Sequence, residues 1–180
     1  MPQRNDTREI SRMPAIKRWM IKAAFLPVIL LLGAAVAPAE AAEKIRIGAV
    51  ENVVLLPWGV MMPARIDTGA ATSSLDARNL TVKGKNVEFN LPPQYGGRQI
   101  RLPTLRWKTV KSAGNEEKRP VVMLELCIGS KRIRTRVNLN DRSNVKYPII
   151  LGRNTLSRDF VVECSTSYCT KPTCAEVTPQ

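Results

Sequence analysis

One short stretch, residues 64–75, has the composition of a site that could carry acid–base chemistry. Asp67 follows an apolar residue, and Thr68 and Gly69 complete an Asp-Thr-Gly tripeptide. A carboxylate held at the tip of an element can give or take a proton, and the hydroxyls of Thr68 and Ser73 could hold it in place. Gly69 can adopt backbone angles closed to other residues, so main-chain groups could pack beside Asp67. The tripeptide alone also fits an ordinary turn.

Composition limits the other kinds of chemistry. The chain has 180 residues, a formal net charge of +13 and no histidine. The absence of histidine excludes Ser-His-Asp and Cys-His catalysis and zinc sites of the His-Glu-x-x-His type. Length and an apolar content of 44% predict one domain with additional segments.

The first 41 residues have the pattern of a secretory signal peptide. Basic residues precede an apolar run from Ala23 to Ala37, and small residues follow, which predicts cleavage near Ala41 or Ala42. The competing interpretation is an uncleaved anchor, but about fifteen apolar residues are short against the roughly twenty that span a bilayer. We therefore expect a periplasmic or secreted protein that meets the membrane only transiently, during export. The expected divisions are a signal peptide (1–41), one domain (42–163) and a cysteine-bearing tail (164–180).

The basic charge favours acidic partners such as anionic peptides, phosphorylated envelope polymers or lipid head groups. The basic residues alternate with apolar ones, and aromatic residues make up only 5% of the chain. Because nucleic-acid sites combine clustered charge with aromatic stacking, nucleic acid is not an expected partner. A solvated basic face is the simplest alternative.

Four cysteines in an exported chain predict disulfides. Cys127 lies in a strand-like segment, whereas Cys164, Cys169 and Cys174 fall close together in the tail. Three pairings are open. We favour a tail loop closed on itself, with the remaining tail cysteine bonded to Cys127. A four-cysteine zinc site is the alternative, but no Cys-x-x-Cys pair occurs, so no metal site is expected.

Short apolar or alternating runs separated by turn residues predict an all-β barrel or sandwich. A polar segment, Lys111–Arg119, is expected to form a hairpin tip, and Arg153–Ser157 a short helix. The predicted strands are Ile45–Val50, Asn52–Leu56, Val60–Ile66, Thr72–Asp76, Asn79–Val82, Val87–Leu91, Gln99–Val110 (broken by Pro103), Pro120–Ile128, Lys131–Asn138, Tyr147–Leu151 and Phe160–Glu163.

Three ordered motifs resemble those of bacterial retropepsin-like aspartic proteases, a family often labelled ATP-dependent zinc proteases. They are Ala64–Ala70 with Ser73 and Leu75, then Val110–Val121, and finally Leu151–Leu156. The resemblance covers about Val53 to Val162. It implies a closed barrel of short strands with one short helix near the C-terminus. Ala71 and Asp76 stand where many relatives carry a basic residue and a histidine.

The resemblance also implies a homodimer. Peptide hydrolysis by aspartates needs two carboxylates that share a proton, and this chain supplies one, so a second Asp67 must come from a twofold partner. The implied site residues are catalytic Asp67 and, supporting its loop, Thr68, Gly69, Ala70, Ser73, Gly152, Arg153 and Asn154. Thr68 would link the two turns, Gly152 would allow close packing under the turn, and Arg153 would anchor the corner through a buried hydrogen-bond network.

No cofactor is expected. The chain has no Gly-x-x-x-x-Gly-Lys-Ser/Thr loop for ATP. The expected function is an exported aspartic endopeptidase acting on a peptide or protein substrate, which the basic domain would suit if that substrate is acidic. Relatives are associated with glutamate ligases and with trimming of glutamate-rich tails. The alternative is a non-catalytic exported domain on the same fold that binds anionic peptides or envelope polymers.

Overall fold

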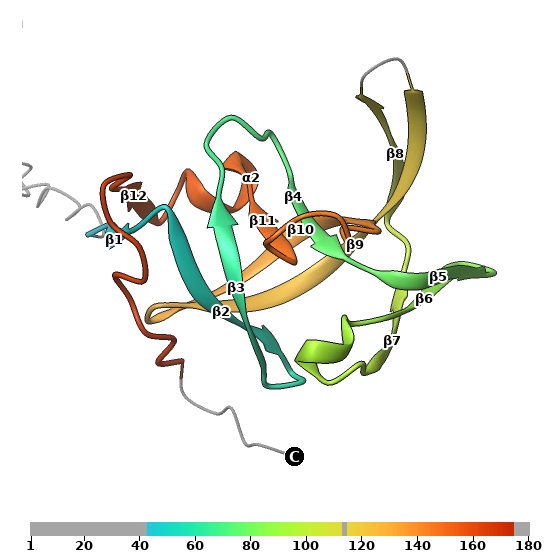
Figure 1. Ribbon diagram of the computed structural model, residues 1–180, viewed down its shortest axis with the longest axis horizontal. Helices are drawn as coiled ribbons and strands as arrows, with labels where there is room; N and C mark the ends of the chain where they lie inside the picture. The colour runs from blue at the N-terminus through green and yellow to red at the C-terminus, as the bar shows by residue number, and fades with distance from the viewer. Residues whose placement is uncertain (1–42, 113–114, 175–180) are drawn as a thin grey trace, which may run out of the picture. The chain divides into compact units, whose positions relative to one another are not determined.

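Six strands close into a barrel in the computed structural model, which describes residues 43–112 and 115–174 (Figure 1). The strand order is β10-β4-β11-β3-β2-β9, and pairing of β9 with β10 closes the ring. The ring strands are β2 (Val50–Leu56), β3 (Val60–Ile66), β4 (Ser73–Asp76), β9 (Asn115–Ile128), β10 (Lys131–Asn140) and β11 (Ile149–Leu151).

Apolar side chains at alternate positions of these strands fill the barrel. In β10, Thr135, Val137 and Leu139 are buried, whereas the intervening Arg134 and Arg136 are exposed. Side chains of successive strand residues point to opposite faces, so the apolar set faces inward. The core also includes Leu55, Met62, Leu75, Leu124, Leu126, Ile149 and Leu151, all at most 2% exposed.

Two parallel pairings in the ring place the ends of distant strands together. β11 runs parallel to β3, with Leu151 beside Ile66, and antiparallel to β4. β4 in turn runs parallel to β10. The segment that follows Leu151 therefore begins beside the turn that follows Ile66. It opens α2 (Arg153–Leu156), the one α-helix among the described residues.

Smaller elements extend the barrel. β8 (Arg106–Ser112) pairs with β9 to form a hairpin that projects from the ring (Figure 1). A separate three-stranded sheet contains β5 (Arg78–Lys83), β6 (Asn86–Asn90) and β7 (Gln99–Pro103). β1 (Ile45–Ile47) pairs with β12 (Phe160–Val162), and a 3-10 helix, η2, spans Pro93–Tyr95.

Two predictions concern the β8–β9 hairpin. Gln99–Val110 was predicted as a strand broken by Pro103, and the chain does break beside that proline, at Thr104–Leu105. Its halves, β7 and β8, belong to different sheets. Lys111–Arg119 was predicted as a hairpin tip, and it spans the end of the β8–β9 hairpin, where strand pairing continues to Ser112 and Asn115.

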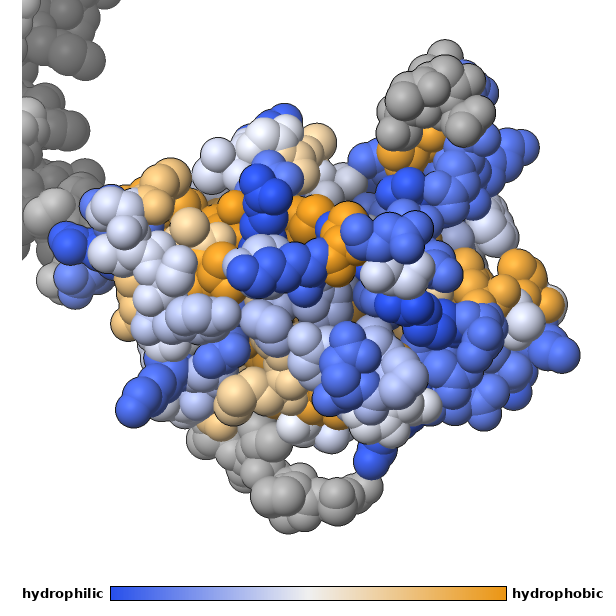
Figure 2. Space-filling model, viewed as in Figure 1, coloured by the Kyte–Doolittle hydropathy of each residue, from blue (hydrophilic) through white to orange (hydrophobic). Residues whose placement is uncertain are grey.

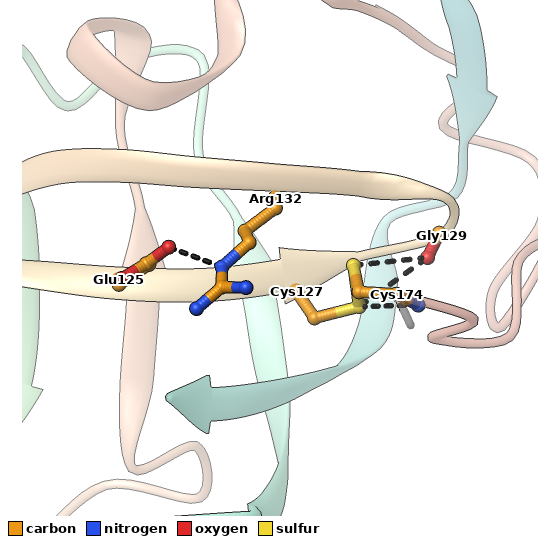
Figure 3. The surroundings of a disulfide bond; sticks show 5 residues. All are labelled: Glu125, Cys127, Gly129, Arg132 and Cys174. Atoms are coloured by element: carbon orange, nitrogen blue, oxygen red, sulfur yellow. Dashed lines mark hydrogen bonds and ion pairs between the residues drawn. A yellow bond between two sulfur atoms is a disulfide. The ribbon is translucent and has the colours of Figure 1, made fainter. Parts of the chain in front are cut away.

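The tail is fastened to the barrel by a disulfide between Cys127 and Cys174, which lies beside the β9–β10 turn at Gly129 (Figure 3). The predicted link between Cys127 and the tail is thus present. The predicted second link is not formed, because Cys164 and Cys169 are free and exposed. The buried carboxylate of Glu51 also holds the tail. It accepts hydrogen bonds from the amides of Cys169 (2.9 Å) and Thr170 (3.1 Å).

The prediction of an all-β, retropepsin-like closed barrel with one short helix near the C-terminus is confirmed. The predicted signal peptide lies outside the described residues. Within residues 43–112 and 115–174, no helix is both long enough and apolar enough to cross a membrane.

Candidate active site

The Asp67 carboxylate is held by its own turn, at the end of β3 (Figure 1). Its Oδ1 atom accepts hydrogen bonds from the backbone amides of Gly69 and Ala70, each at 3.0 Å. The residue is half-buried. Two amide donors on one oxygen fix the orientation of the carboxylate and leave Oδ2 directed away from these bonds, available to a water or a second acid.

Gly69 serves this arrangement differently from the sequence prediction. Its φ angle lies outside the left-handed region, so unusual backbone angles are not the reason for a glycine. A Cβ atom built there would lie 3.2 Å from Asp67 Oδ1. The glycine therefore leaves space for the carboxylate.

Residues after β11 form the floor of the turn. The amide of Asp67 donates to the carbonyl of Leu151 (2.9 Å), and the amide of Arg153 donates to the carbonyl of Ala70 (2.9 Å). Between them, a Cβ atom on Gly152 would lie 2.7 Å from the carbonyl carbon of Thr72. Because real Cβ contacts are not this short, only glycine fits at position 152.

Arg153 anchors the turn from the surface. Its Nη1 atom donates to the carbonyl oxygens of Thr68 (2.9 Å) and Gly69 (2.8 Å). Arg153 itself is exposed. The expectation of a buried network around this arginine is therefore wrong, since its partners are backbone carbonyls of an exposed turn. Thr68 is also exposed.

A network of mainly buried side chains begins one residue further along, at Asn154, which is itself exposed. Asn154 Oδ1 accepts from the amide of Ser73 (2.8 Å), and Ser73 Oγ accepts from the amide of Gly152 (3.0 Å). Ser73 Oγ also lies 2.6 Å from Thr155 Oγ1. These bonds join the start of β4 to α2.

Sequence reasoning missed three members of this network. Thr135 Oγ1 accepts from Asn154 Nδ2 (2.9 Å) and lies 2.9 Å from Thr155 Oγ1, while Asn138 Nδ2 donates to the carbonyl of Ser73 (2.6 Å). The available signal was Thr135, a polar residue on the apolar, inward face of an alternating strand.

Arg142 is half-buried and interacts electrostatically with several charged groups. Burial lowers the pKa of Arg142, the attraction of Asp76 opposes this, and Arg119 and Arg65 lower that pKa further, with Asp67 acting in the raising direction. Arg142 is thus within electrostatic range of Asp67. Asp76 is buried and pairs with both Arg78 Nε (2.7 Å) and Nη2 (2.8 Å).

One contact joins the projecting hairpin to the turn. Lys108 Nζ, on β8, donates to Thr72 Oγ1 at 2.6 Å. Lys108 and Arg142 carried no local signal in the sequence, because each is an isolated basic residue in a basic chain. Among the described residues, no group of three or more His, Cys, Asp or Glu side chains could hold a metal ion.

A closed six-stranded barrel that carries one Asp-Thr-Gly turn above a Leu-Gly-Arg-Asn floor defines a retropepsin-like protein. The chain belongs to the RimB-like family, described as retropepsin-like aspartic endopeptidase RimB, whose family model matches residues 46–173. This confirms the resemblance seen in the sequence.

Individual similar proteins carry other descriptions. The solved structure of Lpg0085 from Legionella pneumophila, described as having unknown function, is 30% identical with a TM-score of 0.62, covering 72% of this chain and 100% of that one. Proteins named probable alpha-L-glutamate ligase, from Shewanella pealeana and Shewanella halifaxensis, are each 31% identical over 137 residues. These matches cover 71% of this chain, and the chain spans about 30% of those relatives.

Proposed function

We propose that this protein is an exported aspartic endopeptidase that acts as a homodimer. The observation that carries the proposal is the Asp67 carboxylate, held through Oδ1 by two backbone amides above a floor where only glycine fits. The predicted leader at residues 1–41 supports export. Hydrolysis by aspartates needs two carboxylates, and a second copy of the chain would supply the second Asp67.

In the proposed mechanism, two Asp67 side chains face each other across the twofold axis and share one proton. Like charges this close cannot both ionise at low cost, so the pair loses its protons in two separated steps. The ionised carboxylate removes a proton from a water, whose oxygen attacks the peptide carbonyl carbon, while the protonated carboxyl donates to the carbonyl oxygen. Collapse of the intermediate returns a proton to the leaving amine.

The substrate class that suits the site best is an acidic peptide or protein. Arg142 is half-buried near Asp67, and Lys108 reaches the turn from β8. Figure 2 shows mainly hydrophilic side chains over the β8–β9 hairpin. A partly buried cation has lost part of its hydration, so it gains more free energy than an exposed cation does when it pairs with a carboxylate of the substrate.

The test combines oligomeric state with turnover. Analytical ultracentrifugation of the purified protein should show a dimer, and a peptide library should be cleaved at mildly acidic pH. Asp67→Asn should abolish cleavage while leaving the fold and dimer intact, because an asparagine oxygen can still accept both amide bonds. Asp159→Asn, the same change far from the turn in sequence, is the control.

Mixing provides a further check. If the dyad is shared, exchange of wild-type protein with an equal amount of Asp67→Asn should leave about a quarter of all dimers fully wild type, half as many as before mixing. The activity of the wild-type protein should therefore fall to about half. A strictly monomeric protein, or cleavage unaffected by Asp67→Asn, would refute the proposal, and unchanged biological function in that variant would favour the non-catalytic binding domain.

A further inference from the structure

An apolar hollow of about 700 Å³ lies at the end of the barrel formed by the β2–β3 turn. Cavities of this size commonly hold small ligands or side chains of a partner. None of its lining residues belongs to the Asp67 turn or its floor. They come from the β2–β3 turn, β7, β9 and β10, and include Leu56, Trp58, Leu102, Met123, Glu125 and Arg134.

A second hollow, of about 280 Å³, continues from the first. Met123 and Arg134 line both, and Arg136 and Asn154 line the second. Because they share two residues, the two hollows adjoin, and together they are called the groove here. The groove crosses the outer face of β9 and β10 and ends at α2.

Arginines line one side of this groove at alternate positions of β10. Arg132, Arg134 and Arg136 are exposed and stand opposite Cys127, Glu125 and Met123. Glu125 forms an ion pair with Arg132 (Figure 3). In the part of the chain that the structure describes, neither Arg134 nor Arg136 has a carboxylate within ion-pair distance.

The geometry of β10 limits how a partner can bind. β9 pairs with β10 from Lys131 to Asn138, whereas β4 pairs only with Val137–Asn140. The hollows are lined by side chains of β9 and β10, so recognition there uses side chains. Alternate residues on one strand face are about 6.8 Å apart, and alternate residues of any extended peptide repeat at the same distance.

We propose that this groove is a docking surface for an extended acidic segment of a protein partner. Two carboxylates at alternate positions of that segment pair with Arg134 and Arg136, and a neighbouring apolar side chain fills the hollow between Trp58 and Met123. Charge complementarity favours this occupant. The surface is separate from Asp67, so the proposal does not depend on catalysis.

The test uses the full chain carrying Asp67→Asn, so that bound peptide is not cut, with Trp19→Phe and Trp107→Phe, so that Trp58 is the one remaining tryptophan. The probe is a fluorescein-labelled peptide of sequence Leu-Gly-Glu-Ala-Glu-Ala. Fluorescence anisotropy should show salt-sensitive binding. An unlabelled copy should change the emission of Trp58.

Arg134→Glu with Arg136→Glu should weaken binding at least about tenfold, because two charge-assisted contacts become repulsive. Lys83→Glu with Lys85→Glu makes the same change in net charge at the exposed β5–β6 turn, and should have little effect. Circular dichroism should show both double variants folded. If the groove variant is unfolded, the conservative pair Arg134→Gln and Arg136→Gln takes its place and should weaken binding in the same direction.

Four results would overturn the proposal. Equal weakening by both double variants would mean general electrostatic attraction. Loss of binding in Arg142→Gln, with full binding in the groove variant, would place the peptide at the Asp67 site. Binding that leaves Trp58 emission unchanged would exclude this occupant. So would a dimer of the unliganded protein that Arg134→Glu with Arg136→Glu dissociates, because a second copy would then cover the groove.

Discussion

Gly152 and Ala70 are so close that a Cβ atom on residue 152 would lie 2.8 Å from the Ala70 carbonyl oxygen. That same carbonyl accepts the amide of Arg153 at 2.9 Å, so it cannot move away without losing a hydrogen bond. The position of the Asp67 turn is therefore set by the backbone beneath it.

Gly152→Ala should destabilise the fold by about 2–3 kcal/mol, because the added methyl meets backbone atoms that cannot rotate aside. Gly69→Ala should cost less than about 1 kcal/mol, since its nearest neighbour is the end of the Asp67 side chain. Urea unfolding of both variants measures the difference. Equal losses would contradict the proposed rigidity of the floor.

Ser73→Ala should cost about 2 kcal/mol, because the amide of Gly152 loses its acceptor inside the protein. Ser157→Ala, a change on the exposed side of the helix end, serves as the control and should be close to neutral. Thermal and urea unfolding report both. A neutral Ser73→Ala would show that a water replaces the hydroxyl.

Arg153→Lys should lower turnover more than stability. A lysine ammonium cannot reproduce the planar guanidinium that spans the carbonyls of Thr68 and Gly69, and its exposure limits the stability loss to roughly 1 kcal/mol. Arg158→Lys is the matched control on an exposed site. Kinetics alongside urea unfolding separate the two effects.

Removal of the Cys127–Cys174 disulfide should cost about 4 kcal/mol, the loop-closure entropy for a separation of 47 residues. Cys174→Ser makes the change with little alteration in volume. Cys164→Ser and Cys169→Ser, which alter free thiols, should leave the urea midpoint within error. A midpoint that falls equally in all three variants would mean that a different pairing forms.

Stability should fall in acid partly through Asp141. The amide of Ser143 donates to its carboxylate at 2.8 Å, and this bond is the main cause that lowers the pKa of Asp141, with Arg78 also contributing. A depressed folded-state pKa gives stability that is present above the unfolded pKa and lost as pH falls through the folded one. Asp141→Asn should flatten the curve of unfolding free energy below about pH 4.

The sequence predicted those parts of the site that lie within short motifs. Asp67 and Gly152 each stand in a compact motif whose spacing reflects direct backbone contact, and the helix predicted at Arg153–Ser157 is present as Arg153–Leu156. The role of Gly69 was misjudged, because a sequence cannot distinguish a glycine that needs unusual angles from one that needs space.

The contacts that were missed join distant parts of the chain. Lys108 meets Thr72, and Arg142 comes near Asp67, only because the barrel closes. Neither residue differs locally from other basic residues. The break predicted at Pro103 is present beside Thr104, but the sequence did not show that β7 and β8 would join different sheets.

Because β3 pairs with β11, the Asp67 turn is completed only late in synthesis of the chain. The turn that carries Asp67 leaves the ribosome or a translocation channel well before Leu151 and Gly152, which complete its floor. Until those later residues arrive, the carboxylate belongs to an open loop and cannot meet a second copy in register. On the proposed function, hydrolysis would therefore begin only after residues 151 and 152 have joined the Asp67 turn.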